Sequence, residues 1–113
     1  MKIRDILAEE KPTLSFEVFP PKTADNYQSV ETAALKIAQA EPAFMSVTYG
    51  AGGGTSQYTV QIASTIKNKG NVTPLAHLTC VSSTRESVKQ ILQELKDNQI
   101  ENVLALRGDI PAE

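Results

Sequence analysis

The segment Leu14-Ser15-Phe16-Glu17-Val18-Phe19-Pro20-Pro21 predicts a short buried strand that contains one carboxylate. Alternate residues from Leu14 to Val18 are apolar and would share one face of the pleat, whereas Ser15 and Glu17 would share the other. The proline pair has no N–H to donate to a sheet and ends the strand. A carboxylate in such a strand is costly unless it is solvated, paired or used. Glu17 is therefore either a rim residue that faces water, as burial statistics favour, or part of a site.

Three more apolar segments follow, and a helical pattern separates each from the next. We expect strands at residues 13–19, 43–48, 73–80 and 102–106, and helices at 2–10, about 23–40, 56–69 and from 83 or 84 onward. Successive strands begin about thirty residues apart, which is the repeat length of an eight-unit β/α barrel. The alternation predicts an α/β fold with a parallel sheet and right-handed crossovers, either in a barrel or in an open doubly wound sheet.

Short polar side chains are expected to set the helix ends. Thr23 or Asp25 can cap the helix that follows the proline pair. Ser83 and Thr84 precede the last helix, and Glu86 stands where a capping box would place it.

The composition is that of one small soluble domain. The 113 residues are 41% hydrophobic and 21% charged with a net charge of -2, so no basic field favours nucleic acid as a partner. Cys80 is the only cysteine, which excludes an internal disulfide and is typical of a reducing cytoplasm. The charged start lacks the apolar core of a signal peptide, and no apolar run reaches the ~18–20 residues of a membrane span. No Cys/His cluster has the spacing of metal ligands, so no metal is expected.

Polar residues gather at the end of each expected strand. They would share one face of the sheet: Glu17 in the first strand, Ser46 and Thr48 in the second, His77 and Thr79 in the third, and Arg107 and Asp109 after Ala105 in the fourth. The alternate positions, which would face the covering helices, are Val47, Leu78, Leu104 and Leu106. Parallel α/β folds place their sites at the carboxyl ends of their strands, so the repeated pattern favours a site.

Each of these residues also has a purely structural interpretation. His77 can be a core histidine bonded to a carbonyl, Thr48 can be a β-branched strand residue, and Arg107 can simply pair with Asp109. The glycine-rich turn Gly50–Thr55 is equally open. Its N–H groups can receive a phosphate, but its last position lacks the glycine or alanine of a dinucleotide fingerprint. The alternative is a permissive turn that lets a ligand approach the backbone.

Four motifs together resemble a known family: Ser15-Phe16-Glu17-Val18-Phe19-Pro20-Pro21-Lys22, Ser46-Val47-Thr48-Tyr49-Gly50-Ala51-Gly52-Gly53, His77-Leu78-Thr79-Cys80 and Leu104-Ala105-Leu106-Arg107-Gly108-Asp109. In this order and at these separations they resemble 5,10-methylenetetrahydrofolate reductase over nearly the whole chain. The resemblance implies an eight-stranded β/α barrel that binds FAD. It implies that NADH or NADPH reduces the FAD, and that methylenetetrahydrofolate then receives the hydride and becomes 5-methyltetrahydrofolate.

The resemblance also implies roles for individual residues. Glu17 matches the general acid that helps to open the five-membered ring of the folate, a role that suits a carboxyl partly withdrawn from water. Asp109 matches an acidic catalytic residue that lies near the flavin and holds the pterin ring, and Ser15 matches a substrate contact. The positions that line the flavin correspond to Thr48, Tyr49, Ala51, His77, Leu106, Arg107, Gly108 and Asp109.

The 113 residues are about half of what such a barrel needs. We expect residues 1–113 to be a single partial domain, the amino-terminal half of the barrel, with four strands, three crossover helices and a short N-terminal helix. A fragment of a longer enzyme, a natural truncation and a half barrel that dimerises would all fit. We expect a homo-oligomer, and weak or absent turnover from the chain alone. The competing function is a non-catalytic module that binds folate or flavin and pairs with another chain.

Overall fold

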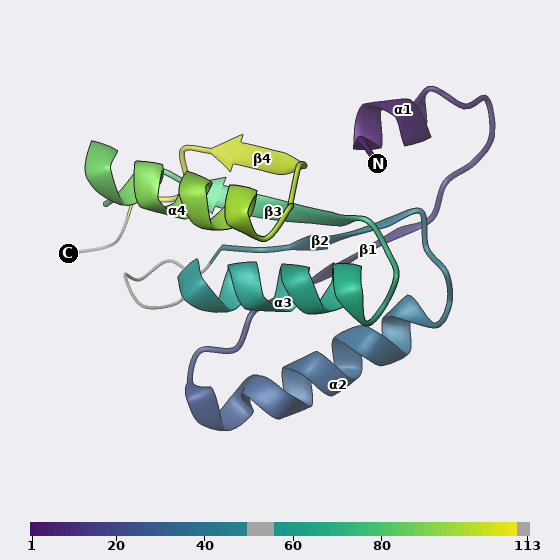
Figure 1. Cartoon of the computed structure of the whole chain (residues 1–113), viewed down its shortest axis with the longest axis horizontal. Coiled ribbons are helices and arrows are strands. Elements are labelled where there is room, and N and C mark those ends of the chain that lie inside the picture. The colour runs from purple at the N-terminus through teal and green to yellow at the C-terminus, as the bar shows by residue number, and fades with distance from the viewer. Residues whose placement is uncertain (50–55, 111–113) are drawn as a thin grey trace.

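A computed structural model describes residues 1–49 and 56–110 of the chain (Figure 1). Its strands are β1 (Ser15–Val18), β2 (Phe44–Val47), β3 (Pro74–Thr79) and β4 (Val103–Leu106). Its helices are α1 (Ile3–Leu7), α2 (Tyr27–Ala38), α3 (Ser56–Asn68) and α4 (Arg85–Asp97), and a 3-10 turn, η1 (Ala24–Asn26), precedes α2. Strands and helices alternate after α1, as the sequence pattern predicts.

The four strands form one parallel sheet in the order β1-β2-β3-β4. Each strand lies beside its successor, so the chain moves in one direction across the sheet, as it does in a β/α barrel. A doubly wound sheet would instead reverse its strand order. The prediction of an α/β fold is therefore confirmed, and the arrangement is that of part of a β/α barrel with α2, α3 and α4 as the crossover helices.

One face of the sheet packs against the crossover helices and forms the core. Met45 and Val47 of β2 and Ala76 of β3 are fully buried on this face. The helices contribute the apolar residues Ala34, Ala38, Val60, Ile62, Ala63, Ile66, Ile91 and Leu95 to the same cluster. Burial of this face fixes the register, because a shift of one residue would turn every core side chain to the other side. In Figure 1, α2 and α3 lie together on one side of the sheet.

The predicted facing of β4 is wrong. Leu104 pairs in register with His77, and Leu106 pairs with Thr79. Both leucines therefore share the face of the sheet that is opposite the crossover helices, here called the inner face, with the polar residues. Side chains of β4 are exposed on both faces, at 38% for Val103 and 40% for Leu104. The strand is apolar throughout, so it offers no alternation from which its facing could be predicted.

The ends of the helices also differ from the predictions. α1 is shorter than predicted. Thr23 holds the N-cap position of η1 without a side-chain hydrogen bond, and Asp25 lies inside that turn. The capping box of α4 joins Thr84 to Ser87 rather than involving Glu86, because each of the two backbone N–H groups donates to the other residue's hydroxyl. The serine at the third helical position thus accepts the hydrogen bond from the N-cap backbone that Glu or Gln usually accepts in a capping box.

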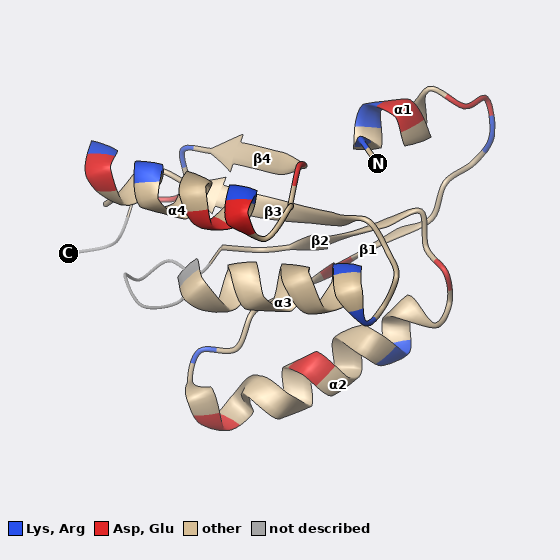
Figure 2. Cartoon of the chain, viewed as in Figure 1, with Lys and Arg blue, Asp and Glu red and all other residues tan. Residues whose placement is uncertain are grey.

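Charged side chains of both signs alternate along α4 and recur on α1 and α2 (Figure 2). In the part of the chain that the structure describes, no helix is long and apolar enough to cross a membrane. Within the same residues, no group of three or more His, Cys, Asp or Glu side chains is placed to hold a metal ion.

Candidate functional site

Three polar side chains from neighbouring strands meet on the inner face of the sheet. The hydroxyl of Ser46 in β2 donates a hydrogen bond to Oε1 of Glu17 in β1 at 3.2 Å. Nε2 of His77 in β3 lies 3.5 Å from the same carboxylate oxygen. The prediction that these residues share one face is confirmed, and the structure adds that they are in contact.

The register of the strands explains this contact. Glu17 lies opposite Ser46, and Ser46 lies opposite Leu75. His77 follows Leu75 by two residues, so it faces the same way and lies one step nearer the carboxyl end of the sheet. All three side chains extend from backbone that is paired within the sheet, which positions them more firmly than a loop would.

The cluster has a buried side and an exposed side. Ser46 is 7% exposed and the His77 side chain 11%, whereas the side chain of Glu17 is 52% exposed. Glu17 is therefore more accessible than the partly withdrawn carboxyl that we expected. Glu17 is both a rim residue and a paired one, since one of its carboxylate oxygens contacts Ser46 and His77. The contact that His77 makes is with this carboxylate, not the carbonyl contact of a core histidine.

Other predicted site residues lie around this cluster. Thr48 and Tyr49 are half-buried just after β2, and the Thr48 N–H donates to the last carbonyl of β1 at 3.0 Å. Ser15 is exposed and shares the face of Glu17, but it lies at the amino end of β1. Ala51 and the rest of the glycine-rich turn fall outside the described residues, so the two interpretations of that turn stay open.

Backbone hydrogen bonds fix the segment that follows β4, whereas most of its side chains are exposed. The Cys80 N–H donates to the Leu106 carbonyl at 2.9 Å, and the next N–H donates to the Arg107 carbonyl at 2.8 Å. Leu106, Arg107 and Asp109 are exposed. The Arg107 Nε–H donates to the Gly108 carbonyl at 3.1 Å. Among the described residues, the ion pair that we considered between Arg107 and Asp109 is not formed.

Thr59, in the first turn of α3, supports the site although the sequence patterns did not single it out. It is 2% exposed, and its hydroxyl donates to the Thr48 carbonyl at 3.0 Å. This bond ties the end of β2 to α3 and satisfies a buried hydroxyl that would otherwise be costly. The available signal was its spacing, because Thr59 falls in helical phase with the buried residues Ile62, Ala63 and Ile66.

Thr59→Val is expected to lower the free energy of unfolding by about 1–2 kcal/mol, because it keeps the shape of the side chain and removes the donor to the Thr48 carbonyl. Thr59→Ser keeps the hydroxyl and is the matched control. Urea unfolding followed by circular dichroism measures both variants. A valine variant that is as stable as the wild type would show that the bond does not stabilise the end of β2.

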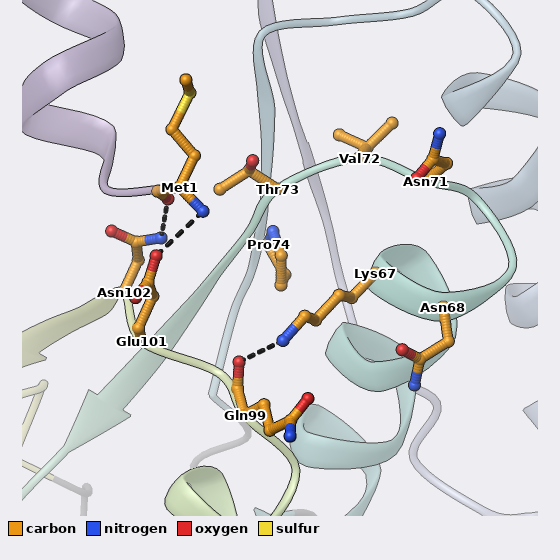
Figure 3. A pocket seen from close by; sticks show the side chains of 10 residues that line it. All are labelled: Met1, Lys67, Asn68, Asn71, Val72, Thr73, Pro74, Gln99, Glu101 and Asn102. Carbon is orange, nitrogen blue, oxygen red and sulfur yellow. Dashed lines mark hydrogen bonds and ion pairs between the residues drawn. The ribbon is translucent and has the colours of Figure 1, made fainter.

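A hollow of about 410 Å³ lies at the opposite, amino-terminal end of the strands (Figure 3). Its charged groups are paired, because the Met1 ammonium lies 2.8 Å from Oε1 of Glu101 and Lys67 donates to the Gln99 carbonyl. The hydrogen bond and the charge of that ammonium lower the pKa of the exposed Glu101 carboxyl. The side chain of Asn102 also bonds to the backbone at the start of the chain. These contacts attach α1 to the start of β4, and we assign the hollow a structural role because β/α folds place their sites at the other end.

Comparisons with known proteins show the family of the chain. The family model described as Methylenetetrahydrofolate reductase matches residues 2–113. The chain belongs to the methylenetetrahydrofolate reductase family. It is 38% identical over 110 residues to Methylenetetrahydrofolate reductase (NADH) 1 of Arabidopsis thaliana, which is 97% of this chain and 19% of that relative.

Bacterial members of the methylenetetrahydrofolate reductase family are similarly related. The chain is 38% identical over 100 residues to the 5,10-methylenetetrahydrofolate reductase of Pectobacterium carotovorum subsp. carotovorum, which is 88% of this chain and 34% of that relative. It is 36% identical over 98 residues to the 5,10-methylenetetrahydrofolate reductase of Escherichia coli (strain K12), which is 87% of this chain and 33% of that relative. The chain therefore spans between about a fifth and a third of the length of the curated relatives it matches.

Proposed function

We propose that this chain forms part of the active site of an enzyme that reduces 5,10-methylenetetrahydrofolate to 5-methyltetrahydrofolate, a step of one-carbon metabolism that serves methionine synthesis. The observation that carries the proposal is the contact of Glu17 with Ser46 and His77 on the inner face of the sheet, in a chain of this family. A half-exposed acid held there lies where a β/α fold binds its substrate. The single cysteine, Cys80, supports a cytoplasmic location.

The residues at the carboxyl end of the sheet fit a flavin. β4 presents Leu104 and Leu106 on the inner face, each 40% exposed, beside the polar cluster. A flat aromatic ring with polar edges requires such an apolar strip with hydrogen-bonding groups at its margin. Bound FAD would supply the hydride chemistry between a reduced nicotinamide cofactor and the folate; the Arabidopsis relative is named for NADH. The residues that we propose hold the flavin are Thr48, Tyr49, His77, Leu106, Arg107, Gly108 and Asp109, with Ala51 among the undescribed ones.

Glu17 is the proposed proton donor. Opening the five-membered ring of methylenetetrahydrofolate requires a proton on the ring nitrogen whose bond to the one-carbon unit breaks. A carboxylic acid within reach of that nitrogen can supply the proton. Asp109, exposed at the same edge, would hold the pterin ring and would disfavour extra negative charge on a reduced flavin. Ser15, on the same face of β1, is proposed as a further substrate contact.

We propose that residues 1–113 are a partial domain, the amino-terminal half of the barrel, and that the chain alone has weak turnover or none. Two observations support this. β1 and β4 each have an unpaired edge in the described sheet, and β4 is exposed on both faces. Exposed edges and apolar faces of this kind favour association, so we expect a homo-oligomer, which size-exclusion chromatography with mass measurement would detect.

The test measures flavin binding and the two half reactions separately. Both the 113-residue chain and an enzyme of full family length that carries these residues are mixed with FAD and freed of excess flavin. Bleaching of the flavin by NADH or NADPH, and its reoxidation by methylenetetrahydrofolate, are then followed by stopped-flow absorbance. We expect both half reactions in the full-length enzyme and little or no turnover in the chain alone. A full-length enzyme that binds flavin but is not reoxidised by the folate would overturn the proposal and favour the non-catalytic binding module.

A further inference from the structure

Both partners of Glu17 approach the same oxygen. The Ser46 hydroxyl donates to Oε1 at 3.2 Å, and Nε2 of His77 lies 3.5 Å from that same atom. Both partners are nearly buried, at 7% exposure for Ser46 and 11% for the His77 side chain. The carboxyl is thus held on the side of Oε1, while more than half of the Glu17 side chain stays open to solvent.

We propose that Ser46 and His77 are positioning residues for Glu17, which hold Oε1 as a hydrogen-bond acceptor and so place the transferable proton on Oε2. This inference rests on the proposed function, in which Glu17 is the acid. It assigns to Ser46 a role that the family motifs do not suggest, and it gives His77 a partner other than the flavin.

The chemistry of the three groups leads to this assignment. A protonated carboxyl has one oxygen that only accepts hydrogen bonds and one that carries the proton. If Oε1 carried the proton, a proton on Nε2 of His77 would face another donor, and Ser46 would have to act as acceptor. Only the tautomer with its proton on Nδ1 could accept from Oε1, and the tautomer of His77 therefore distinguishes the two arrangements. With the proton on Oε2, both partners donate to Oε1. Neutral His77 must then be the tautomer with its proton on Nε2, which leaves Nδ1 unprotonated.

The same arrangement serves the proton transfer itself. The O–H bond of Oε2 breaks as a new N–H bond forms on the folate nitrogen. The electron pair of the breaking C–N bond stays on that nitrogen, and the one-carbon unit is left as an iminium on the other nitrogen. The negative charge that remains on Glu17 is shared with Oε1, to which the Ser46 hydroxyl donates and near which Nε2 of His77 lies at 3.5 Å. Donors placed in advance where charge develops are the usual source of such stabilisation.

The tautomer of His77 tests the contact without any turnover. His77 is the single histidine of the chain, so its two ring nitrogens can be assigned without ambiguity by long-range ¹H–¹⁵N NMR. At about pH 8.5, where histidines are neutral, we expect the wild-type chain to show a protonated Nε2 and an unprotonated Nδ1. Glu17→Ala should shift both ring nitrogens. Glu94→Gln, which changes an exposed carboxylate on α4, is the matched control and should shift neither.

A wild-type His77 with its proton on Nδ1 would overturn the proposal, and this measurement needs no variant. Unchanged ring nitrogens in a folded Glu17→Ala variant would overturn it as well.

The half reactions of the full-length enzyme test the positioning role. Ser46→Ala should slow reoxidation of the flavin by methylenetetrahydrofolate about ten-fold, since it removes a hydrogen bond to a charged group, and should leave flavin reduction within about two-fold. Ser46→Thr keeps a hydroxyl and should restore most of the rate. Combined with Glu17→Gln, Ser46→Ala should add no further loss, because it acts through Glu17.

Equal losses in both half reactions, or a full further loss in the Glu17→Gln background, would show that Ser46 acts on the structure and not through Glu17. The two proposals fail separately. If Glu17→Gln itself leaves folate reduction intact, Glu17 is not the acid, and that part of the proposed function is wrong. If Glu17→Gln abolishes folate reduction but Ser46→Ala does not slow it, only the positioning inference fails.

Discussion

Gly108→Ala is expected to destabilise the chain by about 2–4 kcal/mol, from two separate sources. A Cβ at position 108 would lie 1.9 Å from Cγ2 of Thr79 and 2.8 Å from Cγ1 of Val81, so the neighbouring side chains would have to move. Gly108 also has a φ of +87°, a conformation that alanine adopts only with strain. Because Thr79 ends β3 and Val81 follows it closely, the substitution should also displace the segment that presents Arg107 and Asp109.

Urea unfolding of single and double variants separates the two sources. Thr79→Ser removes the methyl that Gly108→Ala would meet and keeps the hydroxyl. In that background, Gly108→Ala should cost at least ~1 kcal/mol less than it costs in the wild type, because only the backbone strain and the contact with Val81 remain. An unfolding free energy within about 0.5 kcal/mol of wild type for Gly108→Ala alone would contradict the close packing of β3 against the end of β4.

The sequence patterns predicted the elements well and the contacts between them poorly. In the first three strands apolar residues alternate with polar ones, and in the helices between them apolar residues recur at helical spacing. Both patterns arise because these elements bury one side against a common core, and both can be seen in a single sequence. The spacing of the strands was compatible with a barrel and with a doubly wound sheet, and the pairing of the strands decided between them. β4 has no alternation, so only its pairing with β3 reveals that Leu104 lies beside His77.

Single hydrogen bonds were beyond the patterns for a different reason. Ser83 with Glu86 and Thr84 with Ser87 both have the three-residue spacing of a capping box, and a cap is typically worth only about 1 kcal/mol. Likewise, the parity of β1, β2 and β3 placed Glu17, Ser46 and His77 on one face, but parity does not give register. The contact with Ser46 depends on which residue of β2 lies opposite Glu17, and that is set by the packing of Met45 and Val47 on the helices.

Glu17→Gln should reduce the rate of folate reduction by about 10² or more in a full-length enzyme that carries these residues. Glutamine keeps the size of the side chain and an oxygen that can accept from Ser46 and His77, so the cluster should persist. It has no acidic proton to give to the folate nitrogen. Reduction of the flavin by the nicotinamide cofactor requires no proton from this residue and should continue at about the wild-type rate.

A single-turnover stopped-flow experiment on wild type, Glu17→Gln and the control Glu94→Gln tests the role of Glu17 as the acid. Each enzyme is reduced with NADH or NADPH and then mixed with methylenetetrahydrofolate, and the flavin absorbance reports both steps. We expect Glu17→Gln to slow only reoxidation by the folate, by about 10² or more, and Glu94→Gln to slow neither step. Equal slowing of both steps by Glu17→Gln, or unimpaired reoxidation, would contradict the claim that Glu17 is the acid of this site.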